Sequence, residues 1–164
     1  MPQLEHMLIR LCDGGFGAIE RVHRWLGRTH VGTISTSELH SQMTTETSKP
    51  VLVDVRSLAE HSISRIPGAI TQADYEADVD SLAGRPVIAY CTVGGRSYWY
   101  ARKLVAGGID AVNYRDGILG WCRAELPLET PDKQPTAAVH PYWPIFRVPD
   151  RYVVNTDRFK KQGK

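Results

Sequence analysis

A short segment of the chain, residues 91–97, brings a cysteine, two glycines and an arginine together in the sequence Cys-Thr-Val-Gly-Gly-Arg-Ser. An apolar run over residues 86–90 precedes it and a helical pattern follows it, so we expect the cysteine between a buried strand and a helix. Free N–H groups at a helix N-terminus and the positive charge of Arg96 both favour the thiolate form of a cysteine. The pattern therefore predicts that Cys91 is an activated nucleophile.

The two glycines of this segment favour an anion-binding loop. Gly94 and Gly95 allow the backbone to curl so that successive N–H groups point inward, an arrangement that binds phosphates and other anions. A simple tight turn would explain the glycines alone, and a buried inert thiol would explain the cysteine alone. Because Cys91 precedes the glycines and Arg96 follows them, we favour a loop that holds an anion over the sulfur.

Short apolar runs alternate with helical patterns along the middle of the chain. Ser35 and Glu38 have the spacing of a capping box before a helix, and residues 41–49 are polar and predict a loop. The alternation predicts an α/β domain with a mainly parallel sheet, and Asp54 and Cys91 then lie at the carboxyl ends of strands, where ligands bind. The runs that are typical of buried strands are residues 31–34, 51–53, 86–90 and 111–114.

Both ends of the chain differ from this middle part. Apolar residues at helical spacing over residues 4–26 predict an N-terminal helical extension. Six of the ten prolines fall between Pro127 and Pro149, with aromatic residues among them, which predicts an extended arm along the surface. The expected organisation is a helical extension over residues 1–30, an α/β domain over residues 31–130, and a Pro-rich, basic tail over residues 131–164.

The composition bears on several other classes of protein. The 164 residues carry a formal net charge of +2, which does not predict nucleic-acid binding, and we interpret the basic C-terminus as a solvated tail. No stretch is long and apolar enough to span a membrane, and the N-terminus does not resemble a secretory signal, so we expect a cytoplasmic protein. The three cysteines include no Cys-x-x-Cys pair and predict neither a disulfide framework nor a metal site.

The loop sequence Cys-x-x-Gly-x-Arg-Ser resembles the active-site loop of single-domain rhodaneses. Asp54-Val55-Arg56 followed by Glu60, the Ile-Pro-Gly-Ala sequence of residues 66–69, and residues 116–121 resemble further segments of that family in the same order. The similarity covers about residues 31–130. It implies the rhodanese-like fold, which is a central, mainly parallel five-stranded sheet flanked by helices on both faces.

The resemblance implies a sulfur transfer in two steps. An anionic, thiosulfate-like donor would give its outer sulfur to Cys91, and the persulfide would pass that sulfur to a thiol or another thiophilic acceptor, which a protein could supply. Apart from the covalent persulfide, neither a metal nor an organic cofactor is expected. The resemblance also implies that the other loop residues bind substrate: Thr92, Val93, Gly94, Gly95, Arg96 and Ser97.

Charged residues outside the loop are expected to support the site. For Asp54, Arg56 and Glu60 we favour ion pairs that position loops over a direct part in the chemistry. Arg65 replaces a histidine that the family often has, and for it a solvated surface charge and an anion contact are equally open. His61 replaces a common aromatic residue and is expected to be exposed.

Two other functions remain open at this point. The loops of cysteine-dependent phosphatases place one more residue between Cys and Arg than the four that separate Cys91 from Arg96, so we expect no phosphatase activity. A rhodanese-like interaction or redox-sensing module is the main alternative, because an activated thiolate is also readily oxidised. Cys122 is expected to be a packed thiol rather than a resolving cysteine. The sequence leaves the oligomeric state and the physiological donor and acceptor open.

Overall fold

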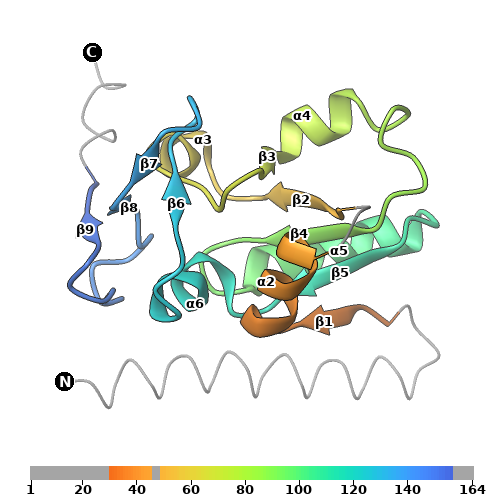
Figure 1. The fold of residues 1–164 in the computed structure, drawn as a ribbon. Helices are drawn as coiled ribbons and strands as arrows, with labels where there is room; N and C mark the ends of the chain where they lie inside the picture. Colours follow the sequence, from red (N-terminus) through yellow and green to blue (C-terminus); the bar gives the residue numbers. More distant parts are fainter. Residues whose placement is uncertain (1–29, 46–48, 157–164) are drawn as a thin grey trace.

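The computed structural model describes residues 30–45 and 49–156, and a five-stranded parallel sheet forms its centre (Figure 1). The strands lie in the order β1-β5-β4-β2-β3, and all four neighbouring pairs run parallel. Their bounds are Gly32–Ile34 (β1), Val51–Asp54 (β2), Ile70–Thr71 (β3), Val87–Tyr90 (β4) and Ala111–Tyr114 (β5). The predicted parallel sheet is confirmed, and only the two-residue strand β3 gave no signal of its own in the sequence.

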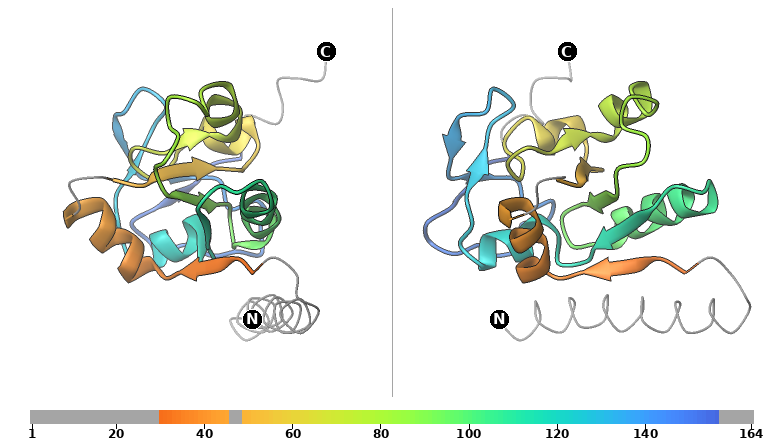
Figure 2. Two further views of the ribbon diagram at one scale, coloured as in Figure 1. Left: turned by 90° about the vertical axis from the view of Figure 1, so that its right-hand side faces the viewer. Right: turned by 45° about the vertical axis from the view of Figure 1, so that its right-hand side comes forward.

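The sheet is covered by helices on both faces, as the resemblance implied (Figure 2). Strands β2 and β4 are buried along their whole length, and their successive side chains join two separate apolar clusters, since side chains alternate along a strand. Helices α2 (Thr36–Thr45) and α6 (Gly117–Arg123) contribute to one cluster. Helices α4 (Gln72–Ala77) and α5 (Gly95–Ala106) contribute to the other.

Helix α2 begins where the sequence predicts and extends further than expected. The Ser35 N–H donates to Glu38 Oε2 at 2.8 Å and the Glu38 N–H donates to Ser35 Oγ at 3.4 Å, so the capping box is formed. The prediction of a loop from residue 41 is wrong, because the helix continues to Thr45. Polar residues are tolerated there because most of the helix surface faces solvent rather than the sheet.

The chain after α6 folds back onto the domain. Strands β6 (Leu128–Glu129) and β7 (Pro135–Thr136) form an antiparallel pair, and β8 (Ala138–Val139) and β9 (Val153–Val154) form a parallel pair. Val139, Phe146 and Tyr152 are buried. Up to residue 156 the tail therefore lies against the domain, and some of its side chains are buried there.

Other expectations for the chain ends stay predictions. The N-terminal helical extension and most of the basic C-terminus lie outside the described residues. Among the described helices, none combines the length and the apolar character that crossing a membrane requires.

Candidate active site

Cys91 lies directly after the central strand β4, at the carboxyl ends of the parallel strands. Helix α5 begins four residues later, at Gly95, so the predicted order of strand, loop and helix is present. Cys91 is only 1% exposed and lines a cavity of about 610 Å³. A reactant must therefore enter this cavity to reach the sulfur.

Gly94 gives the loop its shape. Its φ of +81° lies in the left-handed region, and a Cβ at this position would stand 2.1 Å from the backbone oxygen of Arg115. The Gly94 carbonyl also accepts a hydrogen bond of 3.2 Å from Asn113 Nδ2 on β5. The loop thus packs directly on the backbone that follows β5, and a side chain at position 94 would separate the two.

The beginning of α6 holds the other end of the loop. The Ile118 N–H donates to the Cys91 carbonyl at 2.9 Å, and the Leu119 N–H donates to the Thr92 carbonyl at 3.2 Å. Gly117 has a φ of +60°, and a Cβ there would stand 2.4 Å from the Thr92 oxygen. Two segments that are distant in the sequence, β4 with its loop and α6, therefore fix the backbone around the sulfur together.

Glu60, at the end of helix α3 (Leu58–His61), ties the loop to the rest of the domain. It is 1% exposed, and its carboxylate accepts hydrogen bonds of 2.9 Å from both terminal nitrogens of Arg96 and one of 3.0 Å from Thr92 Oγ1. Ser57 caps α3 and also donates to this carboxylate. Burial alone raises the pKa of Glu60, but the hydrogen bonds from Arg96 and Ser57 outweigh burial and hold the pKa at about 2.

This low pKa predicts that Glu60 makes the protein sensitive to acid. A carboxyl whose pKa falls from 4.5 to about 2 on folding contributes at most about 3 kcal/mol of stability, which is present above pH 4.5 and is lost as the pH falls toward 2. Glu60→Gln is therefore expected to be less stable than wild type at pH 7, and the difference should shrink across this pH range. Urea unfolding at a series of pH values measures both curves, and a constant difference between them would contradict the assignment.

Asp54, at the end of β2, forms the centre of a buried charged network next to the loop. Its carboxylate accepts a 2.6 Å hydrogen bond from Arg56 Nη2 and a 2.9 Å hydrogen bond from the Tyr90 hydroxyl. The Arg56 and Asp54 side chains are both fully buried. Burial alone raises the pKa of Asp54, yet the charge of Arg56 and the hydrogen bond from His61 hold it well below its usual range. This ion pair positions the segment that leads into α3.

The comparison with known proteins agrees with this geometry. A family model described as the rhodanese-like domain matches residues 35–124. The chain belongs to the rhodanese-like domain family. It is 34% identical over 100 residues to a sulfurtransferase of Allochromatium vinosum, and the matched region covers 58% of this chain and 94% of that protein. It is 39% identical over 83 residues to the thiosulfate sulfurtransferase GlpE of Glaesserella parasuis, and here the matched region covers 48% of this chain and 77% of that protein.

Solved structures share the rhodanese-like fold. A thiosulfate sulfurtransferase from Pseudomonas aeruginosa superposes with a TM-score of 0.57 at 27% identity, over 73% of this chain and 22% of that one. A full-length protein from Lactobacillus plantarum superposes with a TM-score of 0.54 at 25% identity, over 71% of this chain and 98% of that one. These similarities confirm the α/β fold that the sequence predicts.

Two residues that depart from the common rhodanese pattern lie elsewhere than expected. The expectation that His61 is exposed is wrong, because it is 6% exposed and its Nδ1 lies 3.0 Å from Asp54 Oδ2. Arg65 neither faces solvent freely nor lines the cavity. Its Nε donates to Glu129 Oε1 at 2.8 Å, so it joins β6 to the turn before β3. His61 is buried beside Asp54 at the end of β2, and Arg65 is not a solvated charge because it pairs with Glu129, which is 64 positions away in the sequence.

Asp116, which with Gly117 begins the segment of residues 116–121, has a structural role at the rim of the cavity. Its backbone φ of −75° suits any residue, so only Gly117 of this pair needs to be glycine. The Asp116 carboxylate accepts hydrogen bonds from the Thr36 N–H at 3.1 Å and from the Thr36 hydroxyl at 2.9 Å. Asp116 thereby caps the beginning of α2 and joins that helix to the rhodanese-like site.

The loop residues of the predicted site divide into two groups. Four of those expected to bind substrate line the cavity with Cys91, namely Thr92, Val93, Gly95 and Arg96. Gly94 shapes the loop without lining the cavity, and Ser97 is fully buried in the first turn of α5. Cys122 is also fully buried, and burial raises its pKa to about 12, which fits the expected packed thiol. Among the described residues, no cluster of His, Cys, Asp or Glu could hold a metal ion.

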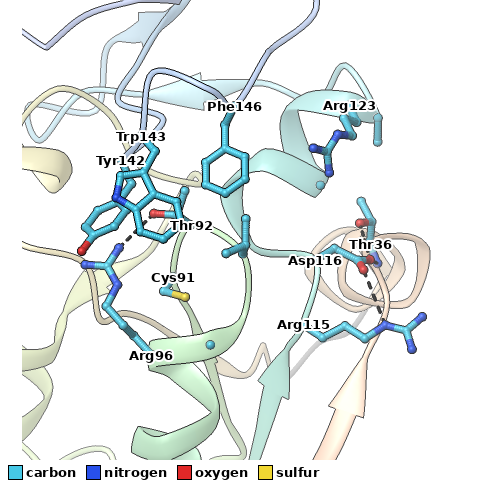
Figure 3. Close-up of a pocket in the computed structure, with 14 residues that line it drawn as sticks. Thr36, Cys91, Thr92, Arg96, Arg115, Asp116, Arg123, Tyr142, Trp143 and Phe146 are labelled. Carbon is cyan, nitrogen blue, oxygen red and sulfur yellow. Dashed lines mark hydrogen bonds and ion pairs between the residues drawn. The ribbon is translucent and has the colours of Figure 1, made fainter. Parts of the chain in front are cut away.

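Nine of the residues that line the cavity were not predicted as site residues from the sequence, and three of these nine are aromatic. Tyr142, Trp143 and Phe146 come from the tail and lie on the side of the cavity next to Arg96 (Figure 3). The Tyr142 ring lies 4.6 Å from the Arg96 guanidinium carbon, as in a cation–π contact. The cluster of aromatic residues among the prolines was the available signal, but no local pattern indicates where such a segment folds back.

Proposed function

We propose that this protein is a sulfurtransferase that carries a sulfane sulfur on Cys91 as a persulfide. The names of the sulfurtransferase and thiosulfate sulfurtransferase relatives support the general activity. The observation that carries the proposal is the position of Cys91. Cys91 lines the cavity at the end of β4, in a loop that leads into α5, and Arg96 lies in the first turn of that helix.

In the first step the Cys91 thiolate attacks the outer sulfur of an anionic donor such as thiosulfate. A bond forms between Cys91 Sγ and that sulfur, and the sulfur–sulfur bond of the donor breaks. Sulfite leaves with the electron pair of the broken bond, so Cys91 becomes a persulfide without any external oxidant or reductant. The backbone N–H groups of the loop and the charge of Arg96 stabilise the anionic donor and the leaving sulfite.

The network around the loop keeps this arrangement ready for the donor. Glu60 holds the Arg96 guanidinium at 2.9 Å through both terminal nitrogens, so the positive charge stays beside the loop before any ligand binds. The carbonyls of Cys91 and Thr92 are engaged by α6, which limits movement of the loop backbone. A site fixed in this way loses little conformational entropy when the donor binds.

The intact mass of the protein tests the proposal directly. After incubation with thiosulfate and removal of excess reagent, wild type is expected to gain the mass of one sulfur atom. Cys12→Ser and Cys122→Ala are expected to gain it as well, whereas Cys91→Ser is expected to show none. An added sulfur that persists in Cys91→Ser, or its absence from wild type with several anionic donors, would overturn the proposal.

A further inference from the structure

The cavity over Cys91 is far larger than a small inorganic sulfur donor or acceptor requires. Its volume of about 610 Å³ lies within the range of roughly 300–1,000 Å³ that is typical of pockets for organic molecules. Thiosulfate and cyanide would occupy only the part next to the sulfur. The rest of the cavity is therefore available to the organic part of a larger substrate.

The wall contributed by the tail is aromatic and lies outside the part of the chain that the family model matches. The ring centroids of Tyr142 and Trp143 lie 5.3 Å apart, and those of Trp143 and Phe146 lie 5.7 Å apart with nearly parallel planes. Phe146 is buried, whereas the Trp143 residue is 53% exposed. A large aromatic ring at the edge of a cavity provides a flat apolar surface on which a ligand can stack.

The backbone holds this aromatic wall in place. Tyr142 has a φ of +70°, which is uncommon for a residue other than glycine, and the Trp143 N–H donates to the Pro141 carbonyl at 2.9 Å across it. The Tyr142 N–H donates to His140 Nδ1 at 3.0 Å, and His140 is itself buried. The turn therefore fixes Tyr142 over Arg96 and presents Trp143 beside the cavity.

The opposite side of the cavity is charged and mainly positive (Figure 3). Arg115, Asp116 and Arg123 line this side, and Arg115 Nε lies 3.5 Å from the Asp116 carboxylate. The Arg115 guanidinium points away from Cys91, whereas Arg123 carries the other positive charge on this side (Figure 3). Arg96 adds a further positive charge next to the aromatic wall. A ligand that combines an apolar ring with an anionic group matches both sides at once.

We propose that the cavity selects a low-molecular-weight organic thiol, with an aromatic or similarly flat apolar body and a carboxylate, as the sulfur acceptor of Cys91. This inference rests on the sulfur transfer proposed above. The thiolate of the acceptor attacks the outer sulfur of the Cys91 persulfide and forms a new sulfur–sulfur bond. The bond from that sulfur to Cys91 breaks and returns its electron pair to Cys91, so an organic persulfide and a free thiolate result without net oxidation.

Two matched thiols test the substrate class with thiosulfate as donor. The compounds 2-mercapto-3-phenylpropanoate and 2-mercaptopropanoate carry the same thiol and carboxylate and differ by the phenyl ring. We expect wild type to show a kcat/KM about tenfold higher for the phenyl compound, the size expected for burying and stacking one ring. In Trp143→Ala the ratio of the two values is expected to fall to about one to threefold.

Trp99→Ala is the matched control, because Trp99 is 50% exposed on α5 and does not line the cavity. The ratio of its kcat/KM values for the two thiols is expected to equal that of wild type. Circular dichroism verifies that each variant is folded, and Trp143→Phe, which keeps a ring, is expected to retain most of the preference. Thiocyanate formation from thiosulfate and cyanide by wild type tests the proposed sulfur transfer separately from the choice of thiol. Suppose that wild type turns over cyanide, so that the proposed function holds. Equal kcat/KM values for the two thiols, or no turnover of either thiol, would then overturn this inference alone. A preference for the phenyl compound that is unchanged in Trp143→Ala would also overturn it.

Discussion

Cys91→Ser is expected to reduce the rate of thiocyanate formation from thiosulfate and cyanide by on the order of 10³-fold or more. A serine hydroxyl is a far weaker nucleophile than a thiolate and cannot store sulfur as a persulfide. The surrounding loop is fixed by backbone hydrogen bonds from α6 and by Glu60, so the substitution should leave the fold intact. Steady-state kinetics with both substrates varied, together with circular dichroism, measures the two effects separately.

Cys122→Ala provides the matched control for this substitution. Cys122 is fully buried and does not line the cavity, so its removal should leave turnover close to that of wild type. If wild type is no faster than Cys91→Ser with several anionic donors, the enzyme assignment fails. Selective oxidation of Cys91 in such an inactive protein would instead support the redox-sensing module that the sequence left open.

Asp54→Asn is expected to lower the free energy of unfolding by about 3–5 kcal/mol at pH 7. The substitution keeps the size of the side chain but removes the negative charge that faces the Arg56 guanidinium at 2.6 Å. Both side chains are fully buried, so the remaining positive charge would stay out of water without a counter-charge. Urea unfolding should show a midpoint lower by about 1 M or more, or a variant that no longer folds.

Asp132→Asn, in the exposed turn between β6 and β7, is the control for this charge removal. A surface substitution of this kind usually changes the stability by no more than about 0.5 kcal/mol. If Asp54→Asn lay within about 1 kcal/mol of wild type, the buried ion pair would not be the element that stabilises this end of the sheet.

The features that the sequence predicts correctly are local or periodic. Four of the five central strands appear as short apolar runs. The signal is clearest for β2 and β4, because a parallel strand covered on both faces buries every side chain. The capping box before α2 involves residues only three positions apart, so its spacing is visible in the sequence. The loop that begins at Cys91 is equally local, since its nucleophile, glycines and arginine follow one another directly.

The features that the sequence does not predict depend on contacts between distant segments. Arg96 is 36 positions from its partner Glu60, and Arg65 is 64 positions from Glu129. No periodic pattern encodes which carboxylate a given arginine will meet, because the choice depends on how loops at the end of the sheet pack. The solvated charge that was one alternative for Arg65 is wrong for this reason. The ion pairs of Asp54, Arg56 and Glu60 were expected, but not all of their partners were.

By itself, the sequence determined the α/β fold, the family and the loop whose cysteine is the proposed nucleophile, because these follow from neighbouring residues and repeating patterns. Only the tertiary structure decided the size and lining of the cavity over Cys91. The tail returns from α6 and places Tyr142 against Arg96, and the neighbouring Trp143 beside the cavity. That return is governed by buried contacts such as Phe146 and Tyr152 and by the pairing of β8 with β9, which are cooperative properties of the folded chain.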